Sequence, residues 1–248
     1  MQNQKLIPDC KIDIGKFWSE VIDYSHKNKV DPTLSYMLIL ENKMHEANLE
    51  ISRENFINYG KELKLFPGVN DWFKRIKNFG KEKNIDVEHY IISSGLTNMI
   101  EGCSFFNELN RVYACEYIFK NGRGLWPKLS VNYSNKVQFL YRIHKGAFEV
   151  NDQEGVNEKK YFGDHIHVPF ENMIFFGDGE TDVPTFNVLN KNNGKSICVY
   201  DDKNQKSTDI AKKLFSDGRV HHLVKNDYQE KSGIDVLLKE IIKTKSEN

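Results

Sequence analysis

The chain has 248 residues, and its 35 lysines and arginines equal its 35 aspartates and glutamates. This length can bury a sizeable core, either as one α/β domain or as a core domain with a smaller satellite. The balanced charge argues against nucleic acid or an anionic membrane as a partner. The four cysteines form no CxxC pair, and no apolar run has the length of a membrane span or a signal peptide, so we expect a soluble cytoplasmic protein.

The first part of the chain is expected to be helical. Residues 1 to about 65 carry apolar side chains at helical spacing. Asp31 and Pro32 make a favourable helix start, and Ser52 is suited to cap a further helix. The aromatic and methionine side chains of this segment are expected to pack in a core rather than to hold a cofactor.

From Phe66 onward, strands alternate with helices, a pattern that is typical of a parallel sheet. A hairpin is expected to turn at Asn121–Gly122. Ser134 is expected to cap a helix that ends at Gly146, and a polar surface insertion follows over residues 147–168. The expected strands are 89–93, 112–115, 173–177, 196–200 and 220–224.

The segment around Asp178 is the most informative part of the sequence. An apolar strand ends in the turn Gly177-Asp178-Gly179, and a helix is expected to begin near Pro184. Glycines let the backbone bend and approach a ligand closely. Asp178 and Asp182 therefore lie at the carboxyl end of a strand, where open α/β sheets hold ligands, and their oxygens suit magnesium.

Two further residues are candidates for an anion site. Ser93 ends a strand just before a glycine turn and a predicted helix, whose free amides could bind phosphate together with the hydroxyl. Lys136 falls in the first turn of its helix, where a cation opposes the helix dipole and would be stabilised by an anion or by carboxylates. Taken singly, a helix-capping serine and a solvated lysine are the commoner outcomes.

The elements Ile91–Gly95, Lys136 and Gly177–Asp182 occur in this order, each at the expected strand or helix end. Together they resemble the second, third and fourth motifs of the haloacid dehalogenase (HAD) superfamily, whose members are mostly magnesium-dependent phosphatases. The similarity covers about residues 66–225, and the helices before it are similar to the cap of phosphoserine-phosphatase-like members. The resemblance implies an α/β Rossmann-like core over residues 66–248, with helices on both faces of a parallel sheet, and a small helical cap over residues 1–65.

The resemblance also implies roles for particular residues. Ser93, with Ser94 and Gly95, would bind the transferring phosphoryl group, and Lys136 would hold its charge and that of the nucleophile. Asp178 would ligate Mg²⁺, while Asp182 would ligate it through water or orient Lys136. These roles fit phosphoryl transfer, which depends mainly on positioning and charge neutralisation.

The family's first motif, an apolar strand ending in Asp-x-Asp that carries the nucleophile, has no counterpart in the helical segment. Four aspartates precede residue 66 without following an apolar strand: Asp9, Asp13, Asp23 and Asp31. We expect the missing strand upstream of Met1; the alternative is a truncated or inactive relative, closed by its N-terminal segment or by a partner strand. Without that strand, the strands ending at Ser93 and Asp178 would each have an unpaired edge.

The sequence therefore predicts a HAD-like hydrolase, a Mg²⁺-dependent phosphatase of a small phosphorylated metabolite that acts through an aspartyl-phosphate. Because the nucleophile is absent from these residues, the chain as given is expected to have little or no activity. The alternative from another class is a non-catalytic module that keeps the phosphate and Mg²⁺ pocket to sense a ligand or dock a partner. Dehalogenation is less favoured, because displacement of a halide by a carboxylate needs no metal.

Overall fold

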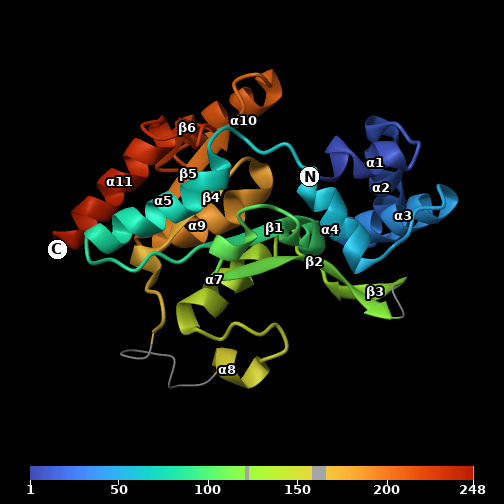
Figure 1. Ribbon diagram of the computed structural model, residues 1–248, viewed down its shortest axis with the longest axis horizontal. Coiled ribbons are helices and arrows are strands. Elements are labelled where there is room, and N and C mark those ends of the chain that lie inside the picture. The colour runs from blue at the N-terminus through green and yellow to red at the C-terminus, as the bar shows by residue number, and fades with distance from the viewer. Residues whose placement is uncertain (121–122, 158–165, 248) are drawn as a thin grey trace. The chain divides into compact units, whose positions relative to one another are not determined.

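The computed structural model describes residues 1–120, 123–157 and 166–247. It confirms the predicted α/β class, with parallel strands and helices alternating along the chain (Figure 1). By their contacts the residues form two compact units: unit 1 comprises Met1–Asn132 and Ile242–Asn248, and unit 2 comprises Tyr133–Ile241. This division differs from the expected end of a cap at residue 65, and the cap stays a prediction.

Unit 1 begins with helices, as predicted. Three of them start at a side chain that accepts a backbone N–H: Asp13 from Lys16, Asp31 from Thr33 and Leu34, and Ser52 from Asn55. Such caps satisfy amides that have no partner within the helix. The helical elements are η1 (Gln2–Gln4), α1 (Leu6–Asp9), α2 (Ile14–Asn28), α3 (Pro32–Glu46) and α4 (Arg53–Lys61).

After α5 (Val69–Glu82), unit 1 contains a sheet in the order β1-β2-β3. β1 (Tyr90–Leu96) pairs in parallel with β2 (Arg111–Lys120), and β2 pairs antiparallel with β3 (Arg123–Leu129). The connection from β1 to β2 contains α6 (Thr97–Glu101) and η2 (Phe106–Glu108). The predicted hairpin is confirmed, while its expected turn at Asn121–Gly122 lies outside the described residues.

Within unit 1, the N-terminal helices pack closely against α6 and the hairpin. The Tyr117 hydroxyl on β2 donates to the Met37 carbonyl on α3 at 2.6 Å, and the Tyr117 ring stacks on Phe56 of α4. α4 and α6 approach so closely that a Cβ atom on Gly102 would lie 2.9 Å from the Cα atom of Gly60. The first 65 residues are therefore joined to β2 by a buried hydrogen bond and to the end of α6 by close backbone contact.

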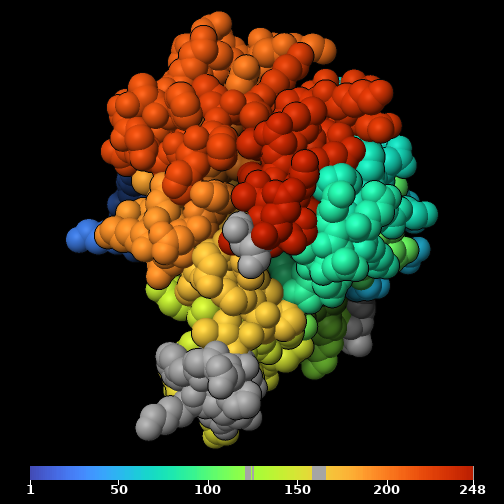
Figure 2. Space-filling model, turned by 90° about the vertical axis from the view of Figure 1, so that its left-hand side faces the viewer, coloured from blue at the N-terminus to red at the C-terminus, as the bar shows by residue number. Residues whose placement is uncertain are grey.

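Unit 2 contains a second sheet in the order β4-β5-β6, in which all neighbours are parallel. Its strands are β4 (Ile174–Gly177), β5 (Lys195–Tyr200) and β6 (His222–Lys225). Its helical elements are α7 (Lys136–Lys145), α8 (Gln153–Asn157), η4 (Phe170–Asn172), η5 (Glu180–Asp182), α9 (Val183–Lys191), α10 (Gln205–Ser216) and the first part of α11 (Gly233–Ser246), which belongs to unit 1 from Ile242 onward. Phe186 of α9 and Leu214 of α10 pack around Cys198 of β5, and α11, red in Figure 2, has an outer face at the surface.

Three expectations from the sequence concern details of unit 2. Gly146 ends α7 with a positive φ of 69°, as predicted for a helix C-terminus. The residue that precedes α7 is Asn135, whose side chain makes no capping hydrogen bond. The expected cap from Ser134, one residue earlier, stays a prediction. The insertion at 147–168 contains the short helix α8, and its residues 158–165 lie outside the described part.

The two sheets show the edges that the sequence predicts. Among the described strands, β1 pairs only with β2, and β4 pairs only with β5. One edge of each strand therefore has no strand partner within that part of the chain. No helix of the described residues has both the length and the apolar character needed to cross a bilayer.

Candidate functional site

Lys136 and Asp182 form a buried ion pair in unit 2. Lys136 is the first residue of α7, and Asp182 directly precedes α9. The Nζ atom of Lys136 donates to Oδ1 of Asp182 at 2.6 Å, and the two side chains are only 9% and 4% exposed. Because an isolated charge is costly to bury, each side chain depends on the other.

The second oxygen of Asp182 is also occupied. Oδ2 accepts a hydrogen bond of 3.0 Å from the backbone N–H of Asp178. Both carboxylate oxygens thus have donors within unit 2, which fixes the carboxylate between α7 and the turn after β4. Of the two roles expected for Asp182, this geometry provides the orientation of Lys136, and ligation of the metal through water stays a prediction.

The two glycines that flank Asp178 differ in the space available for a side chain. A Cβ atom on Gly177 would lie 2.6 Å from both Oδ2 of Asp182 and Cζ of Phe186, so any side chain there would force these groups to shift. A Cβ atom on Gly179 would meet nothing within 4 Å, and its backbone is extended at φ −170°. Gly177 is required by close packing, whereas no contact or backbone angle in the described residues requires glycine at 179.

Asp178 presents the exposed carboxylate of this group. Desolvation by its surroundings, followed by the negative charge of Asp182, raises the pKa of Asp178, and Lys136 opposes the shift. A nearby cation would favour the ionised form of such a carboxyl. Asp178 therefore suits a cation held at the turn.

The carboxylates of this group match the way in which proteins commonly hold magnesium. The described residues contain no group of three or more His, Cys, Asp and Glu that could enclose a metal. Magnesium, however, is commonly held by one or two carboxylates and keeps several waters. Asp178, with Asp182 acting through water, fits that kind of site, and the metal set of Asp178 and Asp182 stays a prediction.

Tyr228 is a neighbour of this group that sequence reasoning missed. It follows β6 at the carboxyl end of the sheet, and burial, followed by the charge of Asp178, raises its pKa to about 12. Residues after the end of a neighbouring parallel strand gather at the same sheet edge. That rule could have pointed to Tyr228, but the sequence does not show which loop side chain turns toward Asp178.

Ser93 lies in unit 1, and its local structure differs from the expected one. The predicted turn at Ser94–Gly95 is wrong, because β1 continues to Leu96 with an irregular register between Ser93 and Leu96. The Ser93 hydroxyl accepts the N–H of Gly95 at 3.0 Å, which supplies that amide with a partner in the extended chain. α6 starts only at Thr97 and has five residues, so its first amides do not directly follow Ser93.

The predicted site residues therefore fall into two groups. Lys136, Asp178 and Asp182 lie together in unit 2 and share hydrogen bonds or charge interactions. Ser93, with its neighbours Ser94 and Gly95, lies in unit 1. The convergence of the two groups on one pocket stays a prediction.

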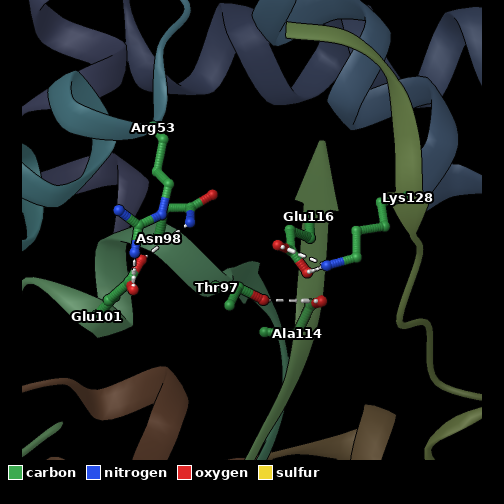
Figure 3. Close-up of polar contacts among 7 residues, drawn as sticks. All are labelled: Arg53, Thr97, Asn98, Glu101, Ala114, Glu116 and Lys128. Carbon is green, nitrogen blue, oxygen red and sulfur yellow. Dashed lines mark hydrogen bonds and ion pairs between the residues drawn. The ribbon is translucent and has the colours of Figure 1, made fainter. Parts of the chain in front are cut away.

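Unit 1 has a polar network just beyond β1 (Figure 3). Glu101 of α6 is bonded to Arg53 of α4 and accepts from Nδ2 of Asn98 at 3.1 Å. Thr97, the first residue of α6, donates to the Ala114 carbonyl on β2. A second ion pair, between Lys128 and Glu116, joins β3 to β2 at 3.0 Å. These contacts tie α6 to the N-terminal helices and to β2, and they were not predicted from the sequence.

The four aspartates before residue 66 lie in helices or at helix starts, in agreement with the sequence analysis. Asp9 in α1 accepts from Lys5 Nζ at 2.8 Å and from the Tyr59 hydroxyl at 3.0 Å. Asp13 and Asp31 cap α2 and α3, and Asp23 lies within α2. None of these four carboxylates stands at the end of a strand.

Comparisons with known proteins show the fold. No protein-family model matches the chain. An uncharacterized protein of Borreliella burgdorferi is 27% identical over 255 residues, which cover 91% of this chain and 85% of that protein. The crystal structure of a HAD family hydrolase from Salmonella enterica serovar Typhi matches 95% of this chain with a TM-score of 0.55 at 17% identity. This chain spans 65% of the length of that hydrolase, and the likeness shows a HAD-like fold.

Proposed function

From this HAD-like fold we propose that the protein is a hydrolase of the phosphoserine-phosphatase-like type, a Mg²⁺-dependent phosphatase of a small phosphorylated metabolite. The observation that carries the proposal is the buried Lys136–Asp182 pair, held by hydrogen bonds beside Asp178. Burial of a lysine is exceptional unless its charge is used or balanced. Here the charge is both balanced by Asp182 and placed beside the exposed carboxylate of Asp178.

The physical requirements of phosphoryl transfer fit these residues. The reaction needs positive charge fixed near the phosphoryl oxygens more than it needs covalent chemistry from the protein. Lys136 supplies one fixed charge, and its bond to Asp182 limits where the Nζ atom can move. Asp178 would hold Mg²⁺, which supplies further charge neutralisation when bound. Ser93 would bind the phosphoryl group. None of these motifs supplies the aspartate that would form the aspartyl-phosphate.

Calorimetric titration of Mg²⁺ tests the metal part of the proposal. The wild-type protein is expected to bind Mg²⁺, and Asp178→Asn is expected to lose that binding. Asp202→Asn is the matched control, because Asp202 is an exposed carboxylate of unit 2 that pairs with Lys225 at 2.7 Å. Unchanged Mg²⁺ binding in Asp178→Asn would contradict the assignment.

The pH dependence of Mg²⁺ binding provides a second test of the same site. A protonated carboxyl no longer ligates a cation, so Mg²⁺ affinity should fall as the pH approaches the pKa of Asp178. Because that pKa is raised, the loss is expected at a higher pH than for an ordinary aspartate. Titrations at several pH values between 4 and 7 would detect this, with the Asp202→Asn protein showing the same profile as wild type.

A screen of phosphorylated metabolites with Mg²⁺ tests the activity. The 248-residue chain is expected to show little or no turnover, and a version extended upstream of Met1 is expected to hydrolyse one or a few substrates. Asp178→Asn in the extended version should abolish this activity. Robust turnover of p-nitrophenyl phosphate by the 248-residue chain, lost in Asp178→Ala, would show instead that the nucleophile lies within it.

The second candidate function is a non-catalytic protein that binds phosphate and Mg²⁺. It is favoured by the finding that the four aspartates before residue 66 lie in helices or cap them, so that none of them ends a strand. Stabilisation by phosphate without turnover, persisting in the extended protein, would support it. Turnover by the extended protein would exclude it.

A further inference from the structure

Thr185 carries a hydroxyl that is buried without a hydrogen-bond partner. The residue is 0% exposed, and its Oγ1 atom has no partner among the described residues. Leaving a buried hydroxyl unpaired is unfavourable, and a valine of nearly the same shape would avoid it. Such a group in a native protein calls for an explanation.

The position of Thr185 in α9 connects it with the ion pair. Asp182 is the residue at the N-cap of α9, but its side chain does not cap the helix, because its two oxygens bond Lys136 and the Asp178 N–H. Thr185 is the third residue of the same helix. The side chain at this position lies on the side of the N-cap residue, one turn along the helix, and in the capping box it reaches back toward the N-cap.

We propose that Thr185 is a positioning residue for Asp182, whose hydroxyl donates to the Asp182 carboxylate when Lys136 turns toward a bound anion. The inference rests on the proposed function, because the anion in question is a phosphoryl group. In the ligand-free structure Lys136 bonds Oδ1 of Asp182, and the Thr185 hydroxyl bonds neither oxygen of that carboxylate. When Lys136 bonds the ligand instead, the hydroxyl replaces it and keeps the buried carboxylate in place.

A thermal double-mutant cycle tests this without any ligand. In the wild-type background, Thr185→Val is expected to leave the melting temperature unchanged or to raise it, since it removes an unpaired hydroxyl. In the Lys136→Met background, Asp182 has lost its cation, and Thr185→Val is expected to lower the melting temperature. An equal effect in both backgrounds would overturn the proposal.

Calorimetric binding of inorganic phosphate in the presence of Mg²⁺ provides a second measurement, which decides the matter if Lys136→Met does not fold. Thr185→Val is expected to bind about tenfold more weakly than wild type, as is common when a group that orients a site residue is removed. Thr185→Ser keeps the hydroxyl and is expected to bind like wild type. Wild-type affinity in Thr185→Val would overturn the proposal, whereas failure of the wild-type protein to bind phosphate would refute the proposed function.

Discussion

Asp182 packs directly against the backbone of Gly177, leaving no room for a side chain on that glycine. The 2.6 Å that would separate a Cβ atom on Gly177 from Oδ2 of Asp182 is far below a normal contact. The last residue of β4 thus sets the position of the carboxylate that holds Lys136. The absence of a side chain at the end of β4 therefore allows the position of the carboxylate that balances the charge of Lys136.

Gly177→Ala is expected to destabilise the protein by about 1–3 kcal/mol, the usual cost of overpacking, and to weaken Mg²⁺ binding, since Asp182 has to shift. Gly179→Ala is the matched control, because its Cβ atom would meet open space and its φ suits any residue. Urea unfolding and Mg²⁺ titration of both variants check this. Equal stability of the two variants would show that Asp182 moves aside at no cost.

Lys136→Met is expected to lower the free energy of unfolding by about 3–5 kcal/mol, because it leaves the Asp182 carboxylate buried without its cation. Chemical denaturation measured on wild type and variant gives this difference. Lys225→Met, which removes the cation of an exposed pair, is expected to change the stability little. If Lys136→Met lowers the free energy of unfolding as little as Lys225→Met does, water reaches Asp182 and the ion pair is not buried as described.

The buried His89 is expected to make unit 1 sensitive to acid. Burial, assisted by the charge of Lys77, lowers the pKa of His89 to about 4, against the opposing hydrogen bond to the Phe73 carbonyl and the charge of Glu108. In the unfolded chain the His89 ring has an ordinary pKa near 6.5 and binds a proton below that pH. The neutral ring therefore contributes stability above pH 6.5 that is lost as the pH falls toward 4, by roughly 2–4 kcal/mol in all.

Urea unfolding of wild type and His89→Gln at pH 7 and pH 4.5 measures this contribution. Glutamine can still donate to the Phe73 carbonyl but does not gain a proton, so the variant is expected to lose less stability on acidification. The comparison also removes the common effect of His221 and His222, whose pKa values are lowered mainly by burial. Identical pH profiles would show that His89 is hydrated in the folded protein.

Tyr117→Phe tests the attachment of the N-terminal helices to the hairpin. The substitution removes the hydroxyl that donates to the buried Met37 carbonyl oxygen. We expect the free energy of unfolding to fall by about 1–2 kcal/mol. Tyr133→Phe, at a residue that is 53% exposed, should stay within about 0.5 kcal/mol of wild type. Equal values for the two variants would indicate that the Met37 carbonyl finds another donor.

Much of the local structure was predictable from the sequence. Asp31-Pro32 and Ser52 marked helix starts, Gly146 marked a helix end, and the apolar run before Asp178 marked β4. Each of these features acts on residues within one turn or one strand. The association of Lys136 with Asp178 and Asp182 followed from a family resemblance, and the structure shows the ion pair that this association requires.

Other features depend on atoms that are distant in the chain. β1 continues through Gly95 as an irregular stretch, because its pairing with β2 runs to Ser93, which lies opposite Ala114, and resumes at Leu96, which lies opposite Cys115. The exclusion of a side chain at Gly177, the freedom at Gly179 and the unpaired hydroxyl of Thr185 depend on how α9 packs against its surroundings. Local sequence thus predicted several helix and strand limits and the residues that can carry charge, but not the end of β1 or the start of α6. Only the tertiary structure decided which of those groups are desolvated and satisfied, because burial and hydrogen bonding are set by neighbours that folding brings together.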